Sequence, residues 1–330
     1  MTKAYTLKNL RVRYGDAEAL SIDKLELPIN QSTALLGENG AGKSTLMNLL
    51  AFIQSPDEGQ IAFLDTPITA KLTPLLRRRI GYVTQQPYLL HGSIEDNLRL
   101  ALKLQGIHQQ QHDKLVDSAL ELVNLKTLAK QAASTLSGGE LKRAAIARAI
   151  VYDPDILLLD EPFSHLDQRH ILQLEKTIQD FAAISGKTVI FSTHDRLQAL
   201  AIADRSINLV AGRVTDVPLL NLYHGRCREQ LFNTGKLAIH VAEEVSHARH
   251  IAIDPRQIIV SDQPLHHTSV LNSFQGRLIQ IAEEAGHVRL LIDCHERFHA
   301  IITPTSLKNL SLAIGDKVWI NFKASAVTVF

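Results

Sequence analysis

The segment that most constrains the fold of this chain is a glycine-rich loop between an apolar strand and a helix. Residues 37–44 read Gly-Glu-Asn-Gly-Ala-Gly-Lys-Ser and fit the pattern G-x-x-x-x-G-K-[ST]. The apolar run 33–36 predicts a buried strand before the loop, and residues 44–51 predict a helix after it. Glycines let the backbone wrap a phosphate with its N–H groups pointing inward, and the helix adds its positive end. We therefore expect this loop to bind the phosphates of a nucleotide.

Two residues of the loop have distinct expected roles. Lys43 is expected to reach the β- and γ-phosphates, and Ser44 to offer its hydroxyl to Mg²⁺, a cation that prefers oxygen ligands. The predicted nucleotide-binding residues of this segment are Gly37, Asn39, Gly40, Ala41, Gly42, Lys43, Ser44 and Thr45.

Two carboxylates follow a second buried strand. The aliphatic run 156–159 is typical of a strand covered on both faces, and Asp160 and Glu161 come directly after it. Ligands of open α/β sheets gather at the carboxyl ends of the strands. We expect Asp160 to hold Mg²⁺ and Glu161 to polarise the attacking water. A strand that simply ends in solvated acids is the weaker alternative, because a phosphate loop lies upstream.

A third motif, Leu-Ser-Gly-Gly-Glu at 136–140, resembles the signature motif of ABC-type ATPases. The other motifs of that family follow in the expected order over about residues 1–215. Tyr14 resembles the aromatic residue that stacks on adenine, Gln85 the Q-loop glutamine, and His194 the switch histidine, while residues 164–167 resemble the D-loop. The alternative for Tyr14 is core packing, and the alternative for His194 is an ordinary polar residue at the end of a strand. Gln86 is the alternative to Gln85 as the Q-loop glutamine.

The resemblance implies a set of roles for these residues. Lys43, Gln85, Glu161 and His194 would be catalytic, and Ser44, Gln85 and Asp160 would hold the Mg²⁺ that accompanies ATP. Ser137, Gly138 and Gly139 would contact the ATP of a second copy, since the start of a helix is an anion site and this chain supplies no anion there. Two departures from the family occur: Leu141-Lys142 replaces a usual glutamine pair, and His165 stands where a small residue is usual.

Alternating short apolar runs and helical patterns predict an α/β fold for the first part of the chain. We expect a P-loop core of the ABC type at 1–215, with a helical subdomain at about 86–150 and a linker at 216–235. Short strands with turns then predict a small all-β barrel of the OB or TOBE type at 236–330.

The last part of that barrel, 268–330, resembles the molybdate-binding (Mop/TOBE) domain found behind some importer ATPases. Hydroxyl and backbone donors can hold a tetrahedral dianion. The candidate oxyanion-binding residues are Ser269, Asn272, Thr303, Ser306, Lys323 and Ser325. Leu271 stands where that family has an arginine, and a domain that only dimerises or stiffens the chain is the alternative.

Composition narrows the function classes. Hydrophobic residues make up 45% of the 330 residues, which excludes wholesale disorder, and a net charge of +1 argues against a protein that coats nucleic acid. The first residues lead into Lys8, Arg11 and Arg13 without an apolar stretch, so we expect no export signal, and no run approaches the roughly 20 apolar residues that a membrane helix needs.

The resemblance therefore implies an importer ATPase for molybdate or tungstate at the cytoplasmic face of the membrane. The chain would be attached to the membrane only through permease subunits, which would dock near residues 85–125. A solute-binding protein would be an indirect partner, and two copies of the chain would form a homodimer. Importers for sulfate, a sugar or a polyamine are the alternatives, followed by a soluble ABC ATPase that transports nothing.

Overall fold

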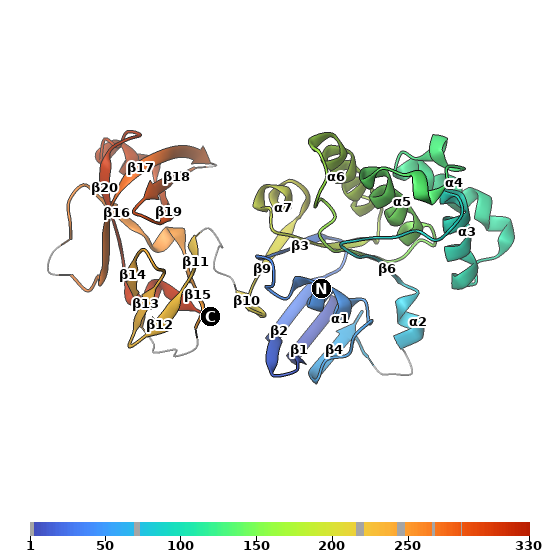
Figure 1. The fold of residues 1–330 in the computed structure, drawn as a ribbon, viewed down its shortest axis with the longest axis horizontal. Helices are drawn as coiled ribbons and strands as arrows, with labels where there is room; N and C mark the ends of the chain where they lie inside the picture. Colours follow the sequence, from blue (N-terminus) through green and yellow to red (C-terminus); the bar gives the residue numbers. More distant parts are fainter. Residues whose placement is uncertain (1–2, 69–72, 216–220, 243–247, 266–267, 285) are drawn as a thin grey trace. The chain divides into compact units, whose positions relative to one another are not determined.

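The computed structural model describes residues 3–68, 73–215, 221–242, 248–265, 268–284 and 286–330 (Figure 1). The chain divides into two compact units, Met1–Val214 and Thr215–Phe330. The first five residues of the predicted linker, 216–220, lie outside the described residues, and the rest of it is not a linker, because strands at 222–224, 226–228 and 231–233 belong to the second unit and its core. Each unit has its own hydrophobic core, so the two are described separately.

A parallel sheet forms the centre of the first unit. The order of its strands is β10-β9-β3-β8-β7-β6, and the β3/β8, β3/β9, β6/β7 and β7/β8 pairs are parallel. The strands are β3 (Ser32–Leu36), β6 (Ile80–Val83), β7 (Ile156–Leu159), β8 (Thr188–Thr193), β9 (Arg205–Val210) and β10 (Arg213–Thr215). Both β3 and β7 are buried along their whole length, as expected for strands covered on both faces. Their carboxyl ends share one edge of the sheet.

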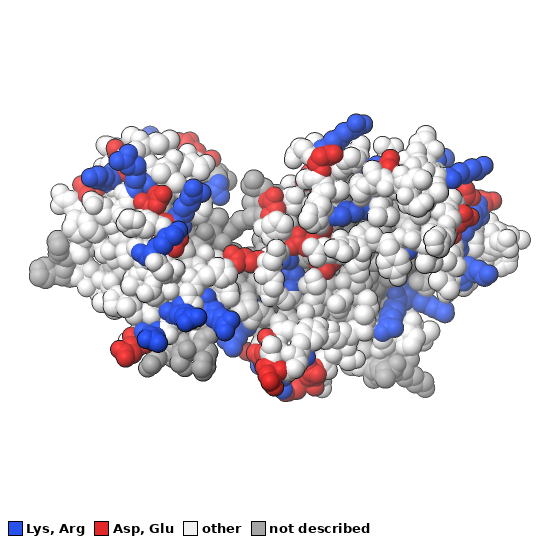
Figure 2. Space-filling view, viewed as in Figure 1, with Lys and Arg blue, Asp and Glu red and all other residues white. Residues whose placement is uncertain are grey.

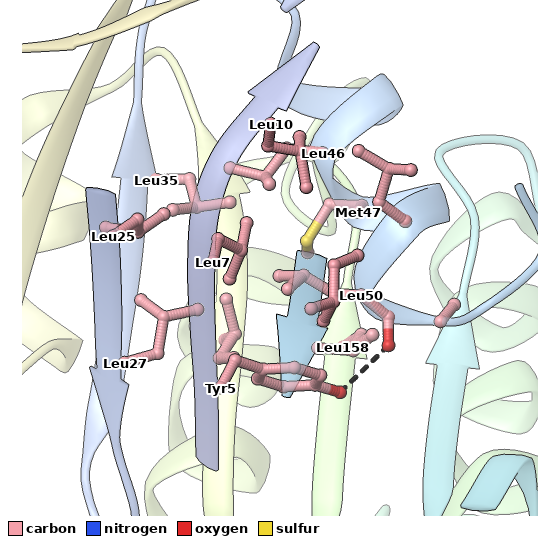
Figure 3. Close-up of a cluster of buried hydrophobic side chains, with 14 of the residues drawn as sticks. Tyr5, Leu7, Leu10, Leu25, Leu27, Leu35, Leu46, Met47, Leu50 and Leu158 are labelled. Carbon is pink, nitrogen blue, oxygen red and sulfur yellow. Dashed lines mark hydrogen bonds between the residues drawn. The ribbon is translucent and has the colours of Figure 1, made fainter. Parts of the chain in front are cut away.

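An antiparallel sheet with order β2-β1-β4-β5 packs on helix α1 and closes the main core. Its strands are β1 (Lys3–Tyr14), β2 (Ala17–Pro28), β4 (Glu58–Phe63) and β5 (Thr66–Pro67). Leucines from these strands meet Leu46, Met47 and Leu50 of α1 (Figure 3). Tyr5 is fully buried there, and its hydroxyl donates to the carbonyl oxygen of Leu50 at 2.9 Å. This core fixes α1 against the sheets, and α1 carries the phosphate loop.

In this unit the structure has the helices α1 (Lys43–Leu50), α2 (Thr73–Arg77), α3 (Ile94–Gln105), α4 (His112–Leu122), α5 (Gly138–Ile150), α6 (Gln168–Ala182) and α7 (Arg196–Ile202). Helices α1, α3, α4, α5 and α6 fall where helical patterns were predicted, whereas the short helices α2 and α7 were not predicted. Helices α3, α4 and α5 pack on one another in the region predicted to be a helical subdomain. Among the described residues, no helix is long and apolar enough to cross a membrane.

The second unit is β-rich, as predicted, with one short added helix, α8 (Pro304–Asn309). The sheet with order β16-β20-β17-β18-β19 comprises β16 (Ile259–Ser261), β17 (Asn272–Glu284), β18 (His287–Asp293), β19 (Arg297–Ile302) and β20 (Lys317–Phe322). Its outer strands β16 and β19 also contact each other, so the sheet curls. The shorter strands are β11 (Leu222–His224), β12 (Arg226–Arg228), β13 (Leu231–Asn233), β14 (Ala238–His240), β15 (His250–Ile253) and β21 (Val327–Val329).

Buried asparagines join the sheets of the second unit. Asn221 is fully buried, donates to the carbonyl oxygens of Ile253 and His299 at 3.2 and 2.8 Å, and accepts from the His299 amide at 2.7 Å. A buried amide with all these partners fixes the position of the strands it joins. On the face shown in Figure 2, acidic and basic side chains both lie on each unit.

Candidate active site

The phosphate loop follows β3 and is shaped by glycines. Gly42 has φ 98°, a left-handed conformation, and a Cβ at this position would lie 2.8 Å from Leu20 Cδ2 and 2.9 Å from the Ala19 carbonyl oxygen. A side chain therefore fits neither the backbone conformation nor the space. The loop closes through the Ala41 amide, which donates to the Glu38 carbonyl oxygen at 3.1 Å. Helix α1 starts at Lys43, directly after this turn.

Lys43 lies at the centre of a buried charge cluster. Its Nζ donates to the carbonyl oxygens of Gly37 and Glu38 at 2.8 and 3.1 Å, and lies 3.0 Å from Glu161 Oε1. The side chains of Lys43 and Glu161 are 6% and 8% exposed. The other oxygen of Glu161, Oε2, lies 3.1 Å from His194 Nδ1. The structure thus brings together three of the four predicted catalytic residues.

Asp160 lies beneath this cluster and is held by β8. Ser192, on β8, donates its hydroxyl to Asp160 Oδ1 at 2.6 Å and accepts from the Glu161 amide at 2.8 Å. Ser192 is fully buried, so one side chain fixes both acidic residues. The prediction from sequence did not include Ser192, because its role depends on the pairing of β7 with β8.

A pocket of about 640 Å³ opens above the phosphate loop. It is lined by Gln85 but not by Gln86, which favours the first of the two candidate glutamines. The residues that line it are Tyr14, Glu18, Ala19, Asn39, Gly40, Gly42, Lys43, Ser44, Thr45, Gln85, Glu161 and Ala211. Of the three residues predicted to hold Mg²⁺, Ser44 and Gln85 line this pocket, whereas Asp160 is buried and is not among the lining residues.

Tyr14 stands at the rim of the pocket with its side chain 54% exposed. It is therefore not a core residue, which was the alternative interpretation. Its hydroxyl donates to Gln54 Oε1 at 2.7 Å, so Gln54 orients the ring. An exposed and oriented aromatic ring can stack on a nucleobase.

The signature residues start helix α5 and do not line the pocket. The Ser137 amide and hydroxyl each lie 2.8 Å from Glu140 Oε2, a capping arrangement that holds the pKa of the Glu140 carboxyl below its usual range. Gly139 is buried, and a Cβ there would lie 2.4 Å from His170 Cδ2. Glycine is thus required at 139 by the packing of α6 on the start of α5.

The candidate oxyanion residues of the second unit differ in their surroundings. Asn272 is buried, and its side chain accepts from the His240 amide at 2.7 Å and donates to the His240 carbonyl oxygen at 2.9 Å. These two bonds join β14 to β17 and use the side-chain amide, so Asn272 is no longer a candidate for binding an oxyanion. Thr303 caps α8 by accepting from the Ser306 amide at 3.1 Å. The structure leaves Ser269, Lys323 and Ser325 exposed.

Comparison with known proteins matches two families to the two units. Residues 20–164 match the ABC transporter family, and residues 268–329 match the TOBE domain. The chain is 31% identical to the molybdate/tungstate import ATP-binding protein WtpC of Pyrococcus abyssi, over 90% of this chain and 91% of that protein. It is 36% identical to the sulfate/thiosulfate import ATP-binding protein CysA of Mycobacterium bovis, over 66% of this chain and 62% of that protein.

One of the similar solved structures is the ATP-binding cassette MJ0796, in a dimeric post-hydrolysis state bound to ADP and Pi. It superposes with a TM-score of 0.57 and 28% sequence identity, over 64% of this chain and 96% of that one.

Proposed function

The chain belongs to the ABC transporter family of ATP-binding subunits, and from that membership we propose that it energises an importer for molybdate or tungstate. The observation that carries the ATPase part is the buried pair of Lys43 and Glu161, which lines the pocket, with the exposed His194 imidazole in contact with the Glu161 carboxylate. The oxyanion is supported by the molybdate/tungstate relative, because that similarity spans both units.

In this proposal, ATP binding replaces the Glu161 carboxylate by phosphate as the anionic partner of Lys43. The triphosphate enters the pocket with its phosphates on the loop amides, and Lys43 turns from Glu161 toward the β- and γ-phosphates. The Glu161 carboxylate is then free to accept a proton from the attacking water, while His194 keeps it oriented. Mg²⁺, held through Ser44, Gln85 and Asp160, would neutralise charge on the phosphates.

A second copy of the chain completes the site in this proposal. The amide-rich start of α5, at Ser137 to Gly139, is a helix end suited to an anion, and it does not line the pocket above the phosphate loop of its own protomer. The dimeric cassette MJ0796 supports pairing of two copies. Such a symmetric contact places each signature segment against the triphosphate of the other copy.

Exposed apolar side chains of the helical region provide the proposed docking surface for the permease. Tyr88, Leu90 and Leu104 are 69%, 47% and 72% exposed. Arg148 lies 5.7 Å from the centroid of the Tyr88 ring and helps to hold it. Through this contact the chain would be peripheral on the cytoplasmic side of the membrane and act indirectly with a solute-binding protein.

A sulfate importer is the second candidate, because the sulfate/thiosulfate relative is more similar over the region it matches. We favour molybdate or tungstate because the molybdate/tungstate relative matches 90% of this chain, whereas the sulfate/thiosulfate relative matches only 66% of it. The exposed Ser269, Lys323 and Ser325 remain the proposed anion-binding candidates of the second unit.

Uptake by cells tests the cargo. A strain lacking the gene is complemented with the parent chain or with Glu161→Gln, and uptake of molybdate, tungstate and sulfate is measured. The proposal expects the parent, and not the variant, to restore molybdate or tungstate uptake. Restoration of sulfate uptake alone would move the assignment to the second candidate.

A further inference from the structure

Lys142 extends from helix α5 to the turn that follows β7. Its Nζ donates to the carbonyl oxygens of Pro162 and Ser164 at 3.0 and 2.5 Å, and to the Ser164 hydroxyl at 3.0 Å. The carbonyl oxygen of Glu161 lies 3.5 Å from the same atom. An ammonium group has three N–H donors, so the three shorter contacts use all of them. One side chain of the signature helix thus binds the backbone that carries Glu161.

The backbone at Glu161 needs such support. Glu161 has φ 45°, in the left-handed region that a residue with a Cβ rarely adopts. A residue in this region keeps its conformation only where its surroundings fix it. Ser164 closes the turn from within, since its amide and hydroxyl donate to the Glu161 carbonyl oxygen at 3.2 and 2.9 Å. Lys142 adds the attachment from a separate element.

We propose that Lys142 is a positioning residue for ATP hydrolysis, which holds the turn 161–164 so that the Glu161 carboxylate points at the reacting γ-phosphate. This inference rests on the ATPase mechanism proposed above. It gives a role to Lys142, which stands where the family usually has a glutamine. Because Lys142 lies close to Ser137 on α5, it also links the signature segment directly to the catalytic base of the same chain.

The charge of Lys142 is sensitive to pH. Burial lowers the pKa of Lys142 to about 8, and the Glu161 carboxylate opposes that shift. The other charged groups at this carboxylate are Lys43 and His194. As pH rises through about 8, the ammonium loses a proton and with it one of its three donors. Hydrolysis is therefore expected to decline on the alkaline side.

Three substitutions test the role of this side chain. Lys142→Arg keeps charge and donors, Lys142→Gln has the neutral residue type usual in the family, and Lys142→Met removes all donors. Lys187→Gln is the matched control. Lys187 is a buried lysine paired with Asp153 at 2.7 Å, and it lies before β8, at the opposite edge of the sheet from the active site.

The measurements are kcat and KM for MgATP from pH 6.5 to 9.5, the affinity for a fluorescent ATP analogue, and thermal unfolding. We expect Lys142→Met and Lys142→Gln to lower kcat about 10- to 100-fold with nearly unchanged nucleotide affinity, since misplaced groups cost rate rather than binding. The alkaline decline should disappear in both, whereas Lys142→Arg should keep the parental rate and hold it to higher pH. Lys187→Gln should keep the parental kcat, KM and alkaline decline, and only its Tm should fall, because it loses the ion pair with Asp153.

The outcomes separate this inference from the function on which it rests. A parent that hydrolyses no ATP refutes both. An active parent whose Lys142→Met variant keeps the parental kcat and alkaline decline refutes the inference alone. If Lys142→Met is unfolded at the assay temperature, the same comparison is decided by Lys142→Gln.

Discussion

Replacing Glu161 by glutamine separates ATP binding from hydrolysis, because one carboxylate both pairs with Lys43 and serves as the proposed base. Lys43 and Glu161 are 6% and 8% exposed, so the substitution leaves a buried ammonium without its counter-charge. Removing one partner of a buried ion pair costs about 3–5 kcal/mol. Lys43 keeps its hydrogen bonds to the carbonyl oxygens of Gly37 and Glu38, so we expect the lower end, about 3 kcal/mol.

This cost predicts a thermal shift that nucleotide reverses. In a unit of this size, 1 kcal/mol corresponds to roughly 2–4 °C, so the Tm of the nucleotide-free variant should fall by roughly 6–12 °C. The phosphates of ATP supply Lys43 with new negative partners. Saturating MgATP should therefore raise the Tm of Glu161→Gln by more than it raises the Tm of the parent.

Hydrolysis should respond in the opposite direction. Loss of a general base lowers a rate by about 10²–10⁴-fold, so phosphate release by Glu161→Gln should be at least about 100-fold slower. The assays are thermal unfolding with and without MgATP, and phosphate release at saturating ATP. Parental turnover by the variant would refute the assignment of the base, and an unchanged Tm without nucleotide would refute the account of the ion pair.

Three further substitutions test other parts of the structure. Lys43→Ala should weaken ATP binding strongly in an equilibrium titration, because it removes the cation that faces the phosphates, and parental affinity would contradict the phosphate-loop assignment. Tyr14→Ala should raise the Kd of ATP about tenfold while Tyr14→Phe changes it little, because a stacked base contributes about 1–3 kcal/mol; an equal effect of both would locate the effect in the hydroxyl. Asn221→Ala should destabilise the second unit by about 3 kcal/mol in denaturant unfolding, because it removes the three hydrogen bonds that this buried amide makes with Ile253 and His299, whereas the exposed Asn309→Ala should have little effect.

The chemistry of the first unit was predictable because its motifs sit at the ends of strands. Lys43, Gln85, Glu161 and His194 follow β3, β6, β7 and β8, and parallel strands bring their carboxyl ends to one edge. Strand β2 was not predicted, because its buried residues alternate only at 20 and 22 and again at 25 and 27, and the step of three between 22 and 25 breaks the period of two.

Contacts between distant segments could not be predicted in this way. Ser192 reaches Asp160 only because β7 pairs with β8, and Lys142 reaches Ser164 only because α5 packs beside the turn after β7. Asn272 shows the same limit in the second unit, since its burial against His240 depends on where β14 lies. Local patterns predict elements and local sites, whereas these side chains depend on the tertiary arrangement.

A structure of Glu161→Gln with MgATP tests the central claim most directly. The account predicts two copies that enclose two nucleotides, with Ser137 and the Gly139 amide of one copy within hydrogen-bond distance of the γ-phosphate bound on the loop of the other. A nucleotide seated on the phosphate loop of a protomer with no signature segment across from it, in crystals and in solution, would contradict the account.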